Sequence, residues 1–351
     1  MHMADALISP IVGGVMWIAS GTTAAVAARS LRRHADLFNV PLMGVMGAFV
    51  FAAQMLNFAV PGTGSSGHLS GGLLLAVLLG PEAALVVIAS ILTVQALLFA
   101  DGGLLALGCN IFNMGVLPAF VALPLFRRII ANRWTRPRIV AASILAAQLG
   151  SLLGASAVVV ETTLSGIASL PFAAFAAAML PIHAAIALAE GLITASVLLF
   201  VQRAQPELIA RTEHRPPHAR RFIATLTATA TIMAAALCWF ASNKPDGLEW
   251  AIERVGHDTD QERPPASRIH DAVASTQDLI SLLPDYRFRA AEASDEHRAW
   301  GTPDAGASIS GLVGGAVTLI VVVALGLLLR RRHPRKPGDS APASTDRRWQ
   351  T

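Results

Sequence analysis

The chain has 351 residues, of which 54% are hydrophobic and only 14% are charged, with a formal net charge of +4. Soluble domains average about 25% charged residues, so the composition excludes an ordinary soluble domain and indicates an integral membrane protein. Aromatic residues make up 6% of the chain, whereas 28 glycines and many alanines favour close contact between helices in lipid. We therefore predict an all-α protein that crosses the membrane several times.

Apolar stretches recur along the whole chain. A membrane-spanning helix needs roughly 20 mainly apolar residues. Eight stretches meet this requirement, at residues 6–28, 42–60, 83–100, 104–126, 139–160, 172–201, 222–241 and 309–329. A ninth, at 69–80, is too short to span by itself and ends before Pro81.

Basic residues decide how these stretches are oriented. Four clusters, which follow the spans at 6–28, 104–126, 172–201 and 309–329, hold 20 of the 27 Lys and Arg residues. The connections at 61–68, 101–103 and 161–171 hold none. The positive-inside rule places all four clusters in the cytoplasm. Only nine crossings satisfy that alternation, so 69–80 must cross too, with the N-terminus outside and the C-terminus cytoplasmic.

The short ninth stretch predicts a depression in the outer surface. Twelve helical residues rise about 18 Å, which does not cover a hydrocarbon core of about 30 Å. The outer end of 69–80, at His68, is therefore expected below the membrane surface. Non-helical backbone at that depth is tolerated where it lines a cavity, and the glycine-rich stretch 61–67 is typical of such backbone.

The first two residues, Met1 and His2, can form a metal chelate. The terminal amine, the backbone nitrogen of His2 and the His2 imidazole close two fused rings in one plane. A fourth nitrogen would complete a square, a geometry typical of Ni(II) or Cu(II). His68, expected at the same depth and on the same side, is the candidate fourth donor. The alternative is that the Met-His start is accidental and that His68 is structural.

Four stretches resemble a known family. They are MHMADALISP at 1–10, PGTGSSGHLSGGLLLAVLLGP at 61–81, QALLFADGGLLALGCNIFNMG at 95–115 and HAAIALAEGLITA at 183–195. They are similar to the CbiM/NikM permeases, the substrate-binding components of energy-coupling-factor transporters for cobalt and nickel. Over residues 1–201 the resemblance implies seven helices, an extracellular N-terminus, and metal ligation by the Met1 amine, the His2 amide and imidazole, and the His68 imidazole.

The segment that follows the chelating pair departs from the family. The usual continuation after Met-His is Ile-Pro-Asp/Glu-Gly, whereas this chain continues with Met3, Ala4, Asp5 and Ala6. We therefore expect this segment to pack differently from that of the family.

The second part of the chain resembles a different subunit. PDGLEWAIERVG at 245–256 and SLLPDY at 281–286 are similar to the accessory subunit with the PDGLE motif, which has two helices and an extracellular loop. The resemblance implies a fusion, and we infer no metal ligands from this part. The expected division is a permease domain at 1–201, a cytoplasmic linker at 202–221, an accessory domain at 222–329 with an outer loop at 242–308, and a basic tail at 330–351.

Ionisable residues inside a membrane are costly and are therefore candidates for function. His183 and Glu190 are seven residues apart and share one helical face. They form either a buried hydrogen-bonded pair, the favoured interpretation, or a group that sets cavity polarity or coupling. Asp101, at the outer end of its helix, either hydrogen-bonds a histidine from the second shell or caps the following turn, and capping is favoured.

Small residues recur every four positions on the second span, at Gly44, Ala48 and Ala52. This pattern permits close helix contact. Internal packing is the simpler interpretation, and docking to a transmembrane coupling subunit is the functional one.

These observations predict the substrate-binding component of an ATP-driven importer for Ni(II) or Co(II), with nickel favoured, in a bacterial inner membrane. The metal is the transported substrate, and no resident cofactor is expected. Energy would come from a transmembrane coupling subunit and ATPase subunits, because the glycines of 61–67 lack the Lys-Ser/Thr of a phosphate-binding loop. No nucleic-acid partner, direct ATP binding or catalytic residue is expected.

A membrane metal sensor or metalloenzyme that uses the same histidines is the alternative. A planar site of four nitrogens leaves no obviously open position for water, however, and catalytic zinc sites keep one.

Overall fold

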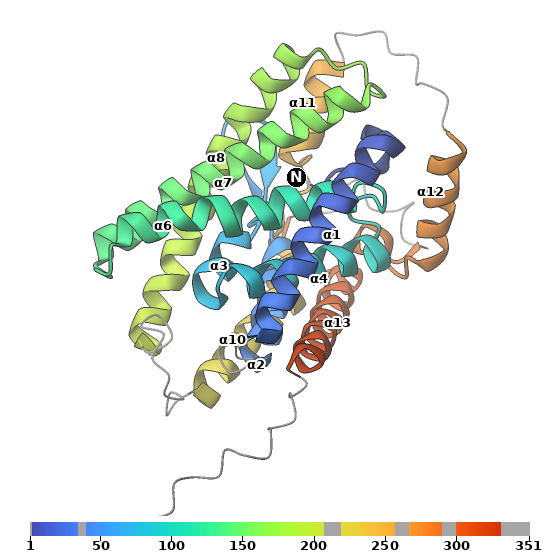
Figure 1. Cartoon of the computed structure of the whole chain (residues 1–351). Helices are drawn as coiled ribbons and strands as arrows, with labels where there is room; N and C mark the ends of the chain where they lie inside the picture. Colours follow the sequence, from blue (N-terminus) through green and yellow to red (C-terminus); the bar gives the residue numbers. More distant parts are fainter. Residues whose placement is uncertain (1, 34–39, 207–218, 257–266, 290–299, 331–351) are drawn as a thin grey trace, which may run out of the picture.

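The computed structural model describes residues 2–33, 40–206, 219–256, 267–289 and 300–330, and most of them are helical (Figure 1). The all-α prediction is confirmed. Within the described residues, six helical stretches are long and apolar enough to cross a membrane. They are Pro10–Arg33 (α1), Pro81–Phe99 (α4), Leu107–Ile130, Arg136–Ser165 (α7), Phe172–Ala204 (α8) and Ala305–Leu329 (α13). The third consists of Leu107–Ile111 (α5), a π-helical part at Phe112–Ala122 (η2) and Leu123–Ile130 (α6).

Three shorter helices, α2, α10 and α3, complete the predicted set of apolar elements; the first two are described here. Val40–Gln54 (α2) and Ala219–Ala235 (α10) end earlier than the predicted stretches 42–60 and 222–241, and a 3-10 turn at Leu237–Phe240 (η3) follows α10. After α2 the chain forms a strand, Phe58–Ala59 (β1), antiparallel to Ser66–Gly67 (β2). Hydropathy misplaced the end of α2 because the apolar residues continue to Val60, although the backbone has already left the helix.

The predicted short stretch is the eight-residue helix Gly72–Leu79 (α3). Glycines with positive φ stand on both sides of it, Gly71 at 76° and Gly80 at 91°. A Cβ at Gly71 would lie 2.4 Å from Cγ1 of Val50, so the turn into α3 is tightly packed. Beyond α3, the Glu82 carboxylate accepts a hydrogen bond of 3.4 Å from Ser30 near the arginine-bearing end of α1. Glu82 therefore lies near the end of α1 that carries Arg32 and Arg33, and the crossing of α3 stays a prediction.

We predict that α3 crosses from outside to inside, so that Glu82 faces the cytoplasm. In a chain without Cys109 and Cys238, a membrane-impermeant thiol reagent should not label Glu82→Cys from outside. Asn243→Cys, at an exposed position of the loop that is expected outside, is the positive control. Labelling of Glu82→Cys in sealed cells, at a rate like that of Asn243→Cys, would contradict the topology.

The described residues between 219 and 329, hereafter the C-terminal segment, pack along the rest of the described chain. Helices α10 and α13 lie against α2, and Gly247–Gly256 (α11) lies against α8. Arg268–Ile280 (α12) contacts α4 and the 3-10 turn Asp5–Leu7 (η1). A Cβ on Gly44 would lie 2.6 Å from Cγ2 of Val323. The small-residue stripe therefore meets α13 at Gly44, in line with the internal-packing interpretation; docking to a coupling subunit stays a prediction.

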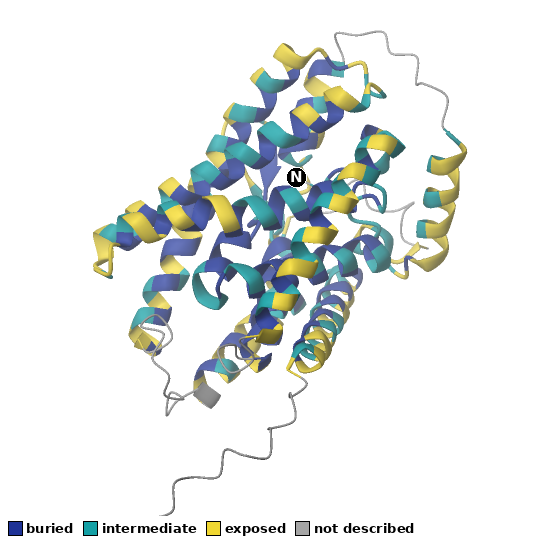
Figure 2. Cartoon of the chain, in the orientation of Figure 1, coloured by how far each residue is buried: buried dark blue, intermediate teal, exposed yellow. Residues whose placement is uncertain are grey.

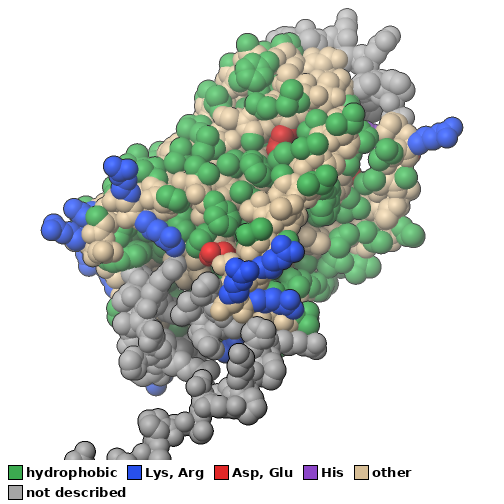
Figure 3. All heavy atoms as spheres, in the orientation of Figure 1, with side chains coloured by type: hydrophobic (Ala, Val, Ile, Leu, Met, Phe, Trp, Pro, Cys, Tyr) green, Lys and Arg blue, Asp and Glu red, His purple; other side chains and the backbone are tan. Residues whose placement is uncertain are grey.

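Burial and surface character fit a membrane protein. Buried residues are concentrated between the helices, whereas the outer faces of α1 and α13 carry exposed apolar side chains (Figure 2). The face seen in Figure 3 is mainly hydrophobic, and most of its basic side chains lie toward its lower and left edge. Arg32 and Arg33 end α1, and Arg127 and Arg128 lie in the last turn of α6.

Candidate metal centre

Hydrogen bonds to Met3 fix the backbone of the segment that follows the N-terminus. The backbone N–H of Met3 donates to Oδ1 of Asn110 at 2.8 Å, and the Asn110 amide donates to the Met3 carbonyl at 3.2 Å. Gly103 N–H donates to the same carbonyl at 2.9 Å, and the Met3 side chain is fully buried. This clamp holds the backbone beside His2 in place. Met1, the predicted amine donor, lies outside the described residues.

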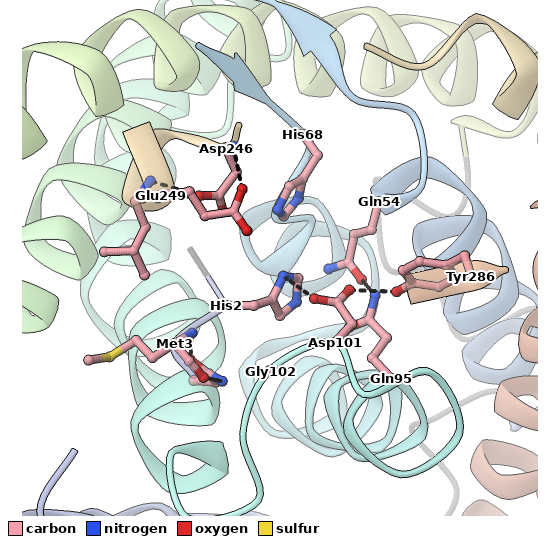
Figure 4. A network of polar contacts seen from close by, with 12 residues as sticks. His2, Met3, Gln54, His68, Gln95, Asp101, Gly102, Asp246, Glu249 and Tyr286 are labelled. Atoms are coloured by element: carbon pink, nitrogen blue, oxygen red, sulfur yellow. Dashed lines mark hydrogen bonds and ion pairs between the residues drawn. The ribbon is translucent and has the colours of Figure 1, made fainter. Parts of the chain in front are cut away.

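His2 lies beside His68. This proximity agrees with the prediction that both are candidate metal donors on the same side. Their rings stack with centroids 5.2 Å apart and an interplanar angle of 18° (Figure 4). The His2 side chain is 9% exposed. Its Nε2 is buried and has no hydrogen-bond partner among the described residues. A buried nitrogen without a partner is costly in a folded protein and marks a position that a ligand can satisfy.

His68 presents one defined nitrogen to the site. Its Nδ1 lies 3.2 Å from the carbonyl oxygen of Leu69, so the Nδ1–H tautomer donates there and Nε2 keeps its lone pair. Burial lowers the pKa of His2, and it lowers the pKa of His68 to about 3. Both imidazoles are therefore neutral near pH 7, which is the form that binds metals.

The orientation of the His2 ring has a consequence for chelation. The six-membered chelate ring that includes the His2 backbone nitrogen must close through Nδ1. In this structure Nδ1 lies 3.4 Å from Oδ1 of Asp101, and Nε2 is the nitrogen without a partner. A half-turn about the Cβ–Cγ bond exchanges Nδ1 with Cδ2 and Nε2 with Cε1, so Nδ1 turns away from Asp101. Nδ1 could then bind the metal, and Nε2–H would be left to donate to a carboxylate, the carboxylate–histidine–metal arrangement common at metal sites.

Asp101 is held by a residue from the C-terminal segment. The Tyr286 hydroxyl donates to Oδ2 of Asp101 at 2.5 Å, and the Tyr286 ring stacks on Phe99 with centroids 4.8 Å apart. Asp101 therefore joins His2 to Tyr286 (Figure 4). These contacts support the histidine-bonding interpretation over the favoured cap. Tyr286, the one tyrosine in the chain, lies in no sequence pattern that predicts this contact.

Removing the hydroxyl in Tyr286→Phe is expected to weaken nickel binding about tenfold, as loss of a partner behind a metal ligand typically does. The ring remains stacked, so the temperature of unfolding should change little. Calorimetric titration of the purified chain measures the affinity. In an Asp101→Asn background the same substitution should have no further effect. Equal affinity of Tyr286→Phe and the unmodified chain would contradict this role.

A cavity of about 20 Å³, large enough for a water molecule, lies beside His68. Within it, Nδ1 of His183 donates to the Met179 carbonyl at 2.8 Å. Glu190 accepts from the Ser70 hydroxyl and from Gly71 N–H. Because these hydrogen bonds go to other partners, a polar cavity describes His183 and Glu190 better than the favoured direct pair. The residues that line the cavity are Gly67, His68, Ser70, Met114, Ser151, His183, Ile186, Glu190, Asp246 and Gly247.

Asp246 and Gly247 reach this cavity from the C-terminal segment. In Figure 4, Asp246 lies next to the His68 ring, and His2 lies below both. No metal ligand is predicted from the PDGLE motif by its sequence. A Cβ on Gly247 would lie 3.0 Å from Cε1 of His183, so the motif lies directly over the polar cavity.

The fold and the site together define a multi-pass helical membrane protein that gathers two neutral histidines beside its N-terminus. Residues 2–208 match the family described as the cobalt uptake substrate-specific transmembrane region, CbiM, and residues 220–331 match the PDGLE domain. The CbiM match covers more than half of the chain, and this chain therefore belongs to the CbiM family, with a PDGLE domain behind it.

Similar proteins match either nearly the whole chain or about 60% of it. A putative fused nickel transport protein, NikMN, of Archaeoglobus fulgidus is 33% identical over 94% of this chain and 98% of its own length. A cobalt transport protein CbiM of Sorangium cellulosum is 33% identical over 60% of this chain and 95% of its own length. A crystal structure described as that of a transition metal transporter is 29% identical, with a TM-score of 0.52, and the match covers 60% of this chain and 96% of that one.

Proposed function

We propose that this chain binds Ni(II) or Co(II) at the outer face of the membrane as the substrate-binding component of an energy-coupling-factor importer. The observation that carries the proposal is the stacked pair of neutral imidazoles, His2 and His68, beside the N-terminus. The proposed ligands are the Met1 amine, the His2 amide and imidazole, and Nε2 of His68. The metal is the transported substrate.

Nickel is the proposed substrate before cobalt. Two backbone-derived nitrogens and two imidazoles suit a square-planar ion, which favours Ni(II). The similar NikMN of Archaeoglobus fulgidus is named as a nickel transport protein, whereas the CbiM of Sorangium cellulosum is named for cobalt.

The proposed transporter contains further subunits. A transmembrane coupling subunit and ATPase subunits would supply the energy, in a bacterial inner membrane with the N-terminus outside. We propose that residues 1–201 form the metal-binding domain, that 202–221 form the linker and that 222–329 form the accessory domain. Parts of the linker, and all of the predicted tail 330–351 except its first residue, lie outside the described residues.

The function is tested by uptake of radioactive nickel in cells that carry the whole system. Cells with the unmodified chain should accumulate nickel, and cells with His68→Ala should not, at equal amounts of chain in the membrane. A sensor or a metalloenzyme would leave accumulation unchanged in the His68→Ala cells. That result would contradict the proposed function.

We expect the affinity for nickel to weaken as pH falls. The slope of the affinity against pH should be set by the protons that the terminal amine and the His2 amide release. The terminal amine, with an ordinary pKa of about 7.7–8.0, and the amide must both lose protons. The imidazoles are already neutral because their pKa values are lowered. About two protons should therefore be released per ion near pH 6.5, as measured by calorimetry in buffers of different ionisation enthalpy. Release of three or more would show a protonated imidazole.

A further inference from the structure

A second hollow lies outside the candidate metal centre. It is an open groove of about 880 Å³ between the residues that follow α2, helix α8 and the residues from η3 onward. Pockets that hold small organic molecules typically enclose about 300–1,000 Å³. The groove is therefore large enough for part of a lipid molecule, and none of the described residues that line it belongs to the proposed donor set.

Polar side chains gather at one end of the groove. The Ser242 N–H donates to the Asn57 carbonyl at 2.8 Å, which joins the two loops that form this end. Asn243 and Lys244 follow directly and are exposed. The Lys244 carbonyl accepts from the Ser66 hydroxyl at 2.7 Å, so the backbone here is fixed. This end of the groove thus presents amide donors and a cation on a fixed backbone.

The Lys244 ammonium is not neutralised by the part of the protein that the structure describes. The hydrogen bonds of Lys244 within that part all involve its backbone, and its side chain makes no ion pair there. The described lining of the groove contains no acidic side chain either. An uncompensated positive charge beside an apolar surface favours an anion that also has an apolar part.

The rest of the groove is mainly apolar and aromatic. The rings of Phe240 and Trp300 meet edge to face with centroids 5.2 Å apart, and the Trp300 indole N–H donates to the Phe240 carbonyl at 3.1 Å. Trp300 is nevertheless 74% exposed, and Leu237 on η3 and Ile193 on α8 are exposed as well. Tryptophan is enriched where a membrane meets water, so we expect this part of the groove to face lipid.

The two parts of the groove match the two parts of an anionic phospholipid. Lys244 and the neighbouring amides suit the phosphate of the headgroup, and the apolar lining suits an acyl chain. Phosphatidylcholine gains less from Lys244, because its own quaternary ammonium offsets the phosphate charge. A free phosphate ion gains nothing from the apolar lining. An anionic phospholipid is therefore the ligand that uses both parts.

We propose that the groove binds one anionic phospholipid of the outer leaflet, with the phosphate at Lys244 and Asn243 and an acyl chain along Leu237, Phe240 and Trp300. The choice of leaflet follows the proposed topology, whereas the binding itself does not depend on metal transport. The bound acyl chain removes exposed apolar rings from water, which is the source of the apolar part of the affinity.

Native mass spectrometry of the purified full chain tests the proposal. Phosphatidylglycerol and phosphatidylcholine with identical acyl chains are titrated separately onto chain that has been freed of lipid. The unmodified chain should retain one phosphatidylglycerol about fivefold more tightly than phosphatidylcholine, since a lysine near an anionic headgroup contributes about that factor. Lys244→Gln should lose this preference, and Lys244→Arg should keep it.

Arg268→Gln is the matched control, because Arg268 is an exposed cation on α12 that does not line the groove. It should leave both affinities unchanged. Trp300→Ala should weaken the binding of both lipids about fivefold and keep the preference between them, because it removes apolar contact only. Lys244 and Trp300 are both exposed, so the temperature of unfolding should stay the same in all variants.

Equal phosphatidylglycerol affinity of Lys244→Gln and the unmodified chain would overturn the proposal. The same loss in Arg268→Gln would overturn it too, because the preference would then reflect total charge and not the groove. Displacement of bound phosphatidylglycerol by an equal concentration of glycerol phosphate is the third contradicting result, since the groove would then be a site for free anions.

Discussion

One residue inserted between Met1 and His2 is expected to weaken nickel binding at least about a hundredfold, or about 2.7 kcal/mol. The insertion places a second peptide unit between the amine and the His2 amide, so these two nitrogens no longer close a five-membered ring with the metal beside His68. An N-terminal tag should have the same effect, because it converts the amine to an amide, which is a far poorer donor. Calorimetric titration of nickel into tagged and untagged chain measures the loss.

The matched control restores the original terminus. Cleavage of the tag immediately before Met1 should recover the full affinity. The temperature of unfolding should stay the same throughout, because α1 begins only at Pro10 and no helix is altered. Equal affinity of tagged and untagged chain would exclude the amine as a ligand.

The second large effect is expected at the two histidines. His2→Ala removes one imidazole and His68→Ala removes the other, so each should weaken nickel binding by about a hundredfold or more. His183→Ala is the comparison variant, because it also removes a buried histidine near His68. Nδ1 of His183 is bonded to the Met179 carbonyl, and His183 lines the cavity outside the proposed donor set. It should therefore lose much less affinity.

The same titrations decide between a specific site and a general need for buried histidine. If His183→Ala weakens binding as strongly as His68→Ala, the donor set is wrong. If neither His2→Ala nor His68→Ala weakens binding, the stacked pair has a structural role only. Unfolding temperatures measured in parallel identify a variant that has simply lost its fold.

The sequence predicted the position of His68 through a length argument. A twelve-residue apolar stretch is too short for the bilayer, so its outer end had to lie in a depression, and His68 stands at that end. The structure places His68 against His2, 66 positions away in the chain. Chain length and charge placement are local properties, so the sequence could place the two histidines near each other; the depth of His68 in the membrane stays a prediction.

Asp246 and Tyr286 were missed for a different reason. The spacing of Asp246 and Glu249 is that of a capping box, so the sequence could have predicted the start of α11. It could not predict that this start attaches to Ser66, or that Tyr286 reaches Asp101, because both contacts join residues more than 175 positions apart. Such docking depends on the assembled shape of the bundle, which no local pattern encodes.

The most direct test of the metal centre is X-ray absorption spectroscopy of the nickel-loaded, untagged chain. We expect a nickel ion with four nitrogen donors in a plane, of which two are imidazoles. His68→Ala, loaded at high nickel concentration, should lose the signal of one imidazole. A sulfur donor, or an octahedral shell of oxygen donors in the unmodified chain, would contradict ligation by the Met1 amine, the His2 amide and imidazole, and His68.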